Sequence, residues 1–159
     1  MVSGILSMPW LRRSVPVIPM SQRQVMPSLT LKQLDGDTWR LADHRGQAIL
    51  INYWATWCAP CRNETPGLVR LADDERAKGL AVLGISMDTG DPELVRSFVR
   101  QMRVAYPIAL PEPMSQMAAG MVGLPTSILV DRHGRIAKTY IGETPEAEFR
   151  ADLDKVLAE

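Results

Sequence analysis

Two cysteines separated by two residues lie between a predicted buried strand and the first turn of a predicted helix. Ala48–Trp54 is a near-continuous apolar run, which is typical of a central strand covered on both faces. The apolar residues of Ala59–Lys78 recur at helical spacing, and Gly79 is the expected end of that helix. Cys58 and Cys61 therefore lie at the first turn of a helix that follows a buried strand.

Strands and helices alternate along the rest of the chain, which predicts an α/β fold. The other expected elements are a hairpin of Ser28–Leu34 and Thr38–Leu41 around Asp35-Gly36-Asp37, strands at Leu80–Met87, Tyr106–Leu110, Pro125–Val130 and Arg135–Ile141, a helix opened by Asp91-Pro92-Glu93, a short helix at Met114–Met121, and a last helix opened by Thr144-Pro145-Glu146. The C-terminal hairpin makes the central sheet mixed, and we expect helices on both of its faces.

The composition limits the function classes that this chain can serve. With 159 residues, 46% of them hydrophobic, it is long enough for one domain with a real core. The 18 basic and 18 acidic side chains balance, so the sequence lacks the positive excess of a nucleic-acid-binding protein. No run of about 18 apolar residues exists that could span a bilayer. Two cysteines are too few for a disulfide-rich scaffold or a four-cysteine zinc site.

The N-terminal segment does not share the periodicity of the remaining sequence. Residues 1–27 are rich in proline and follow neither a strand nor a helix period, so we expect an extended, partly ordered arm before a domain at residues 28–159. A secretory signal places positive charge before its apolar stretch, whereas Arg12 and Arg13 follow the uncharged Met1–Leu11. Either an export signal or anchor was removed from this chain, or the arm is a cytosolic linker.

The position of the cysteine pair favours reactive thiols. The positive end of the helix dipole and the unpaired N–H groups of a first turn stabilise a thiolate, which lowers the pKa of a cysteine there. We expect Cys58 to be the exposed, activated thiol and Cys61 to be shielded one turn further in. Pro60 suits the first turn because it needs no hydrogen-bonded N–H there.

A zinc site and a structural disulfide each account less well for the cysteine pair. Half of a zinc site would need two further ligands, and His44 and His133 have no ligand-like spacing to Cys58. A purely structural disulfide between Cys58 and Cys61 would close a very small loop and remove little chain entropy. A redox-active pair is the favoured interpretation, and no metal is expected.

The sequence around the cysteines resembles a known family. The run from Tyr53 to Cys61, Tyr-Trp-Ala-Thr-Trp-Cys-Ala-Pro-Cys, is similar to the active site of the thioredoxin superfamily. With Asn52, Glu64 and Pro66 added, it resembles the TlpA/ResA/DsbE group of bacterial periplasmic thiol–disulfide oxidoreductases. A second segment, Val122-Gly123-Leu124-Pro125-Thr126-Ser127, is similar to the cis-proline loop of that family. The resemblance covers about residues 28–158 and implies a thioredoxin-like fold with an N-terminal β-hairpin and a central βα insertion at Asp91–Leu110.

The resemblance also implies roles for individual residues. Cys58 would be the nucleophile and Cys61 the resolving cysteine, with Pro125 in cis facing Cys58. The backbone of Leu124 would pair with an extended client segment. The surface around the nucleophile would be completed by Trp57, Ala59 and Pro60.

Two polar residues near the cysteines, Glu64 and Asn52, have different expected roles. Glu64 lies one turn beyond Cys61, where a partly buried carboxyl could relay a proton, or it could be an exposed acid on the helix surface. Asn52 is polar within an apolar strand and departs from the aspartate of thioredoxins. It is expected to be a structural residue that hydrogen-bonds near the active-site helix. Trp54, on the strand, is expected in the core.

The function that follows from the resemblance is thiol–disulfide exchange. The favoured activity is reduction of protein disulfides by a monomer that is recharged by a membrane thiol donor, with cytochrome c maturation among the candidate processes. The expected place is the periplasm, free or membrane-tethered. A disulfide oxidase or isomerase is the main alternative, and a peroxiredoxin-type peroxidase or a binding module without catalysis are others. No nicotinamide or flavin motif is present, so no bound cofactor is expected beyond the Cys58–Cys61 disulfide.

Three further features have ordinary interpretations. Met114, Met117 and Met121 could suggest a copper site, but their spacing is that of one helix face, which favours packing. His133 is expected in a turn before Gly134. His44 is expected on the solvated surface.

Overall fold

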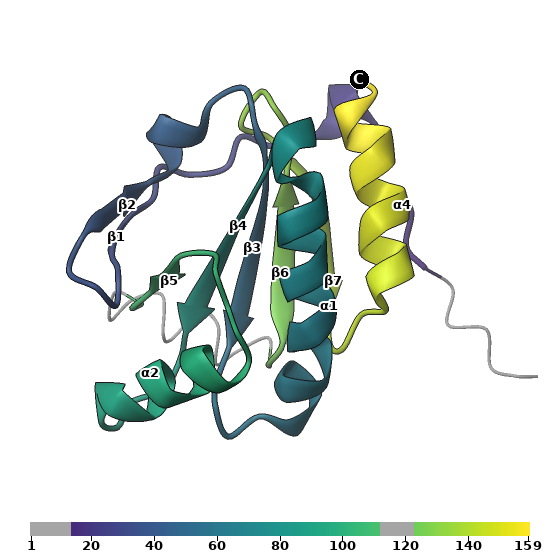
Figure 1. Cartoon of the computed structure of the whole chain (residues 1–159). Coiled ribbons are helices and arrows are strands. Elements are labelled where there is room, and N and C mark those ends of the chain that lie inside the picture. The colour runs from purple at the N-terminus through teal and green to yellow at the C-terminus, as the bar shows by residue number, and fades with distance from the viewer. Residues whose placement is uncertain (1–13, 112–122) are drawn as a thin grey trace, which may run out of the picture.

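The centre of the molecule is a five-stranded mixed sheet. The computed structural model describes residues 14–111 and 123–159. The strand order is β5-β4-β3-β6-β7, with β4 parallel to β3 and β5, and β6 antiparallel to β3 and β7 (Figure 1). The strands are β3 (Ala48–Trp54), β4 (Leu80–Ser86), β5 (Ile108–Ala109), β6 (Thr126–Val130) and β7 (Ile136–Ile141).

Both faces of the sheet are covered, which explains the continuous apolar run of β3. Helices α1 (Ala59–Glu75) and α4 (Glu146–Leu157) cover one face (Figure 1). Helix α2 (Pro92–Gln101) and the hairpin of β1 (Thr30–Lys32) and β2 (Thr38–Arg40) pack on the other. Because side chains alternate along a strand, Leu50 joins the core under α1 and α4, whereas Ile49 and Ile51 join the core under α2 and the hairpin.

The predicted α/β architecture is confirmed, and most element boundaries lie within a few residues of the prediction. Strand β3 has the predicted bounds. Helix α1 ends at Glu75 and continues as a 3-10 turn, Arg76–Lys78, before Gly79 adopts a left-handed conformation with φ of 105°. The Asp91 carboxylate caps α2 by accepting from the Glu93 N–H. The predicted helix at Met114–Met121, with its three methionines, lies outside the described residues.

His44, expected on the solvated surface, is half-buried. Its ring stacks on Trp39 of β2 with centroids 4.8 Å apart, and its Nδ1 lies 2.9 Å from Gln47 Oε1. The side chain of Trp39 is itself buried between the hairpin and the sheet. The histidine therefore closes an edge of the core, a role set by a partner on a different element.

Part of the N-terminal arm is fixed against β7. Hydrogen bonds join the Ile18 N–H to the Ala137 carbonyl and the Ile136 N–H to the Gln24 carbonyl. Arg23 is almost fully buried and forms ion pairs with Asp131, in the turn before β7, and with Glu159. The described part of the arm, residues 14–27, thus adds backbone partners and one buried ion pair to the edge of the sheet.

No helix among residues 14–111 and 123–159 is long and apolar enough to cross a membrane.

Replacing Arg23 should destabilise the fold. Arg23→Ala leaves the buried Asp131 carboxylate without its cation, which we expect to lower the free energy of unfolding by about 3 kcal/mol in denaturant titrations. Arg100 is the matched control because its ion pair with Glu93 is exposed on α2. Arg100→Ala should cost less than about 1 kcal/mol. Equal losses in both variants would contradict a stabilising role for the buried pair.

Stability should also depend on pH through Asp131. Burial alone would raise the pKa of this carboxyl, but the Arg135 N–H, the Arg23 guanidinium and the His133 N–H outweigh it and hold the pKa below its ordinary value of 3.8. A group with a lowered folded pKa stabilises the fold above its unfolded pKa and loses that contribution as the pH falls through the folded value. Below about pH 3.8, Asp131→Asn should therefore lose unfolding free energy less steeply than the wild type; parallel curves would refute this.

Candidate functional site

Cys58 and Cys61 form a disulfide at the start of α1, with Cα atoms 5.3 Å apart. Cys58 is the N-cap of the helix, and its Sγ accepts a hydrogen bond from the Cys61 N–H at 3.3 Å. The structure thereby places a sulfur at the positive end of the helix dipole. Cleavage of the disulfide would leave a thiolate there with a backbone donor already directed at it.

In this disulfide form Cys58 is nearly as buried as Cys61, with 5% and 2% of their surfaces exposed. The expectation of an exposed Cys58 is wrong for this state. The reason is that the N-cap sulfur turns over the first helical turn and packs into the core that contains Trp54 and Ala55. The exposed residue is its neighbour Trp57, which is 72% accessible.

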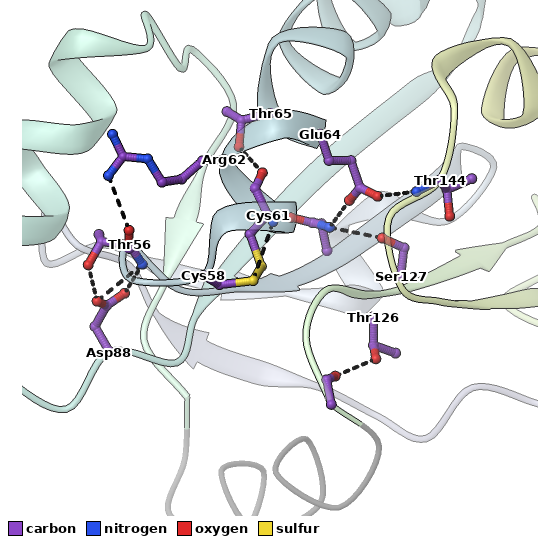
Figure 2. The surroundings of a disulfide bond; sticks show 12 residues. Thr56, Cys58, Cys61, Arg62, Glu64, Thr65, Asp88, Thr126, Ser127 and Thr144 are labelled. Carbon is purple, nitrogen blue, oxygen red and sulfur yellow. Dashed lines mark hydrogen bonds between the residues drawn. A yellow bond between two sulfur atoms is a disulfide. The ribbon is translucent and has the colours of Figure 1, made fainter.

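Glu64 lies one turn beyond Cys61 and is buried, so the alternative of an exposed surface acid is wrong. Its Oε1 accepts from Asn52 Nδ2 at 2.9 Å and its Oε2 accepts from the Thr144 N–H at 2.8 Å. Asn52 also donates to Ser127 Oγ at 2.9 Å. Figure 2 shows this network on the far side of the disulfide from Thr56, joining α1, β3, β6 and the β7–α4 loop.

The loop before β6 lies at the same end of the sheet as the disulfide. Strand β6 runs antiparallel to β3, so β6 begins where β3 ends and α1 starts. The Leu124–Pro125 peptide bond at this point is cis, and the Pro125 carbonyl accepts from the Gly142 N–H. Leu124 packs against the core cluster that includes both cysteines. Val122, the first residue of the predicted loop motif, lies outside the described residues.

The remaining sequence-predicted residues divide between core and surface. Trp54 is buried, as expected from its place in β3, and Ala59 and Pro60 are exposed beside Trp57. His44 and His133, the only histidines of the chain, are not brought to Cys58 by the described structure. No group of three or more histidine, cysteine, aspartate or glutamate side chains within residues 14–111 and 123–159 is arranged to hold a metal ion.

Sequence reasoning assigned no role in the site to four residues that the structure places there. Ser127 and Thr144 complete the Glu64–Asn52 network, and Thr56 and Asp88 are joined by hydrogen bonds just ahead of Cys58. Ser127 was part of the Val122–Ser127 loop motif, and the β3–β6 pairing places it directly opposite Asn52. The contact between Thr56 and Asp88 joins residues 32 positions apart, and no sequence pattern indicates it.

The arrangement is suited to reversible exchange between a dithiol and a disulfide. One sulfur lies at a helix N-terminus, the second follows one turn later, and a buried carboxylate lies a further turn on. An exposed aromatic side chain and a cis-proline loop border the disulfide.

Comparison with known proteins gives matches at the sequence level. The profile of the AhpC/TSA family matches residues 23–148. The thiol-disulfide oxidoreductase ResA of Bacillus cereus is 31% identical over 132 residues, which cover 82% of this chain and 75% of that protein. The thioredoxin-like protein YneN of Bacillus subtilis (strain 168) is 30% identical over 139 residues, covering 86% and 81%.

Solved structures show the same fold. A secreted thiol-disulfide isomerase from Corynebacterium glutamicum superposes with a TM-score of 0.79 at 27% identity, covering 90% of this chain and 91% of that one. A thiol:disulfide interchange protein of the thioredoxin family from Chlorobium tepidum TLS gives a TM-score of 0.76 at 26% identity, covering 86% and 97%.

Removing the Asn52 amide should disrupt the hydrogen bonds around Glu64 and destabilise the fold. Asn52→Ala leaves Glu64 Oε1 and Ser127 Oγ without this donor in a buried setting, so we expect the free energy of unfolding to fall by about 2 kcal/mol. Asn63, exposed on the same helix as Glu64, is the matched control, and Asn63→Ala should stay within about 0.5 kcal/mol. Denaturant titrations measure both, and a loss of less than about 0.5 kcal/mol for Asn52→Ala would contradict the assignment.

Proposed function

The chain belongs to the AhpC/TSA family, and from its oxidoreductase relatives and its cysteine pair we propose that it reduces the disulfides of client proteins. It is a thiol–disulfide oxidoreductase with a thioredoxin-like fold, like the relatives that carry that name. The observation that carries the proposal is the Cys58–Cys61 disulfide at the N-terminus of α1. The direction of the reaction, its partners and its compartment are parts of the same proposal.

The proposed reaction transfers two electrons through a mixed disulfide. The Cys58 thiolate attacks one sulfur of the client disulfide, forming a Cys58–client bond and releasing the other client sulfur as a thiolate. The Cys61 thiol then loses its proton and its sulfur attacks Cys58, closing the intramolecular disulfide and releasing the second client thiolate. The client disulfide is reduced to two thiols and the enzyme dithiol is oxidised.

Glu64 is proposed to receive the proton that Cys61 gives up. The carboxylate is one turn along α1 from Cys61, and both of its oxygens are held by donors, from Asn52 and from the Thr144 backbone. This double anchorage supports a fixed orientation relative to the helix start. Asn52, Ser127 and Thr144 act in this scheme by holding the carboxylate in position.

The client is proposed to contact Trp57, Ala59, Pro60 and Leu124 around Cys58, with the backbone of Leu124, next to Pro125, pairing with an extended client segment. A monomer with residues 28–159 as its catalytic domain would suffice for this chemistry. In the proposed setting it works in the periplasm, free or tethered, and a membrane thiol donor restores its dithiol. Apocytochrome cysteines in cytochrome c maturation are one class of client that fits.

The reduction potential of the Cys58–Cys61 pair tests the direction of the reaction. Equilibration with dithiothreitol or glutathione buffers should give a value near or below about −250 mV, in the range of reductases. A value near about −120 mV would mean that the protein donates its disulfide, which would overturn the reductase proposal in favour of an oxidase or isomerase.

Controls separate this activity from others on the same fold. Cys58→Ser should abolish reduction of a protein disulfide, because no nucleophile remains at the helix N-terminus. Consumption of hydrogen peroxide by the reduced protein at a rate above that of its disulfide exchange would favour a peroxidase instead.

A further inference from the structure

A carboxylate at the end of β4 holds the residue that stands two positions before Cys58. Asp88 accepts the Thr56 N–H with both oxygens, at 3.2 and 3.1 Å, and also accepts the Thr56 hydroxyl. Figure 2 shows Asp88 directly beside Thr56, on the opposite side of the disulfide from Glu64. Neither the Cys-x-x-Cys chemistry nor the Glu64 network uses this carboxylate.

Asp88 is itself fixed to the edge of the sheet. Trp54 at the end of β3 pairs with Ser86 at the end of β4, and the Met87 N–H donates to the Trp54 carbonyl at 2.7 Å. The fully buried Ser86 donates its hydroxyl to Asp88 Oδ2 at 2.8 Å and accepts the Asp88 N–H at 3.2 Å. The carboxylate is therefore anchored before it reaches Thr56.

The other side of Thr56 is held from α1. Arg62 donates to the Thr56 carbonyl at 3.5 Å, and its guanidinium lies 5.7 Å from the centre of the Phe98 ring on α2. The N–H, hydroxyl and carbonyl of Thr56 thus all have partners on other elements. A short loop held in this way has little freedom to reorient.

The residue that follows Thr56 is the most exposed large apolar residue among those that the structure describes. Trp57 is 72% accessible and precedes the nucleophile directly. A client that covers this indole must order it, and an aromatic that is already held in place loses less conformational entropy on binding. Because Trp57 directly follows Thr56, the bonds that hold Thr56 also restrict the backbone from which the indole projects.

We propose that Asp88 is a positioning residue for protein clients, holding the Thr56-Trp57 loop so that Trp57 is ready to receive the client beside Cys58. The proposal rests on the reduction of protein disulfides proposed above. It assigns Asp88 to client recognition and leaves the intrinsic reactivity of Cys58 to the helix N-terminus.

The test compares a protein disulfide with a small one. Asp88→Asn replaces one carboxylate oxygen acceptor by an amide donor, so we expect KM for insulin disulfides to rise about five-fold with kcat within about two-fold. Reaction of the reduced variant with Ellman's reagent, which is too small to need Trp57, should stay within about two-fold of the wild type. Asp91→Asn is the matched control, since Asp91 is an exposed carboxylate that accepts the Glu93 N–H of its own helix and has no bond to the Thr56-Trp57 loop in the described part of the chain.

Thr56→Val tests whether the anchoring of Thr56, rather than the charge of Asp88, supports client binding. It removes the hydroxyl donor and keeps the Asp88 charge, and it should reproduce the selective rise in KM. Three results would each overturn the proposal. The first is an equal loss of activity with insulin and with Ellman's reagent, and the second is an unchanged KM in both variants. The third is a rise in KM that is confined to Asp88→Asn. A wild type that reduces neither substrate would instead refute the proposed function, so the two failures are distinguishable. Melting curves of each variant establish that it is folded.

Discussion

The pairing of β3 with its two neighbours is the constraint on which the site depends. Strand β3 lies between parallel β4 and antiparallel β6, so the end of β3, the end of β4 and the start of β6 meet at one edge of the sheet. From that edge come the cysteine pair, Asp88 and the cis-proline loop. A slip of one residue in the β3–β6 register would turn Asn52 to the opposite face and separate it from both Glu64 and Ser127.

The same register explains how polar groups are tolerated in an apolar strand. Asn52 lies opposite Ser127 in the ladder, and its amide spans from that hydroxyl to the Glu64 carboxylate on α1. The backbone N–H of Thr144 binds the second carboxylate oxygen. Each side chain of this network thus has a partner from a different element, and the network fixes α1 relative to β3, β6 and the β7–α4 loop.

Local signals predicted much of this protein. The apolar run of β3, the proline and aspartate at the start of α2 and the glycine after α1 indicated the α/β order and most element boundaries, because strand periodicity and caps depend on neighbouring residues. The resemblance around the cysteines indicated the site residues. Long-range packing was the part that no pattern revealed.

Three residues show why. The stacking of His44 on Trp39 depends on how a loop folds back over the hairpin, and the bonds between Asp88 and Thr56 cross 32 residues of sequence. The burial of Cys58 reflects the direction in which one side chain turns, which residue type and spacing leave open. The Asp88 contact joins residues that are distant in the chain, whereas His44 and Cys58 are decided by how a short local segment turns.

The near-complete enclosure of Cys58 has a kinetic consequence. With 5% of its surface exposed in the disulfide form, this cysteine has room for one reaction partner at a time. In the proposed cycle, the thiol donor that restores the dithiol and the client that is reduced react with this same sulfur. The two partners therefore exclude each other, and the enzyme has to visit them in turn, releasing one before it meets the next.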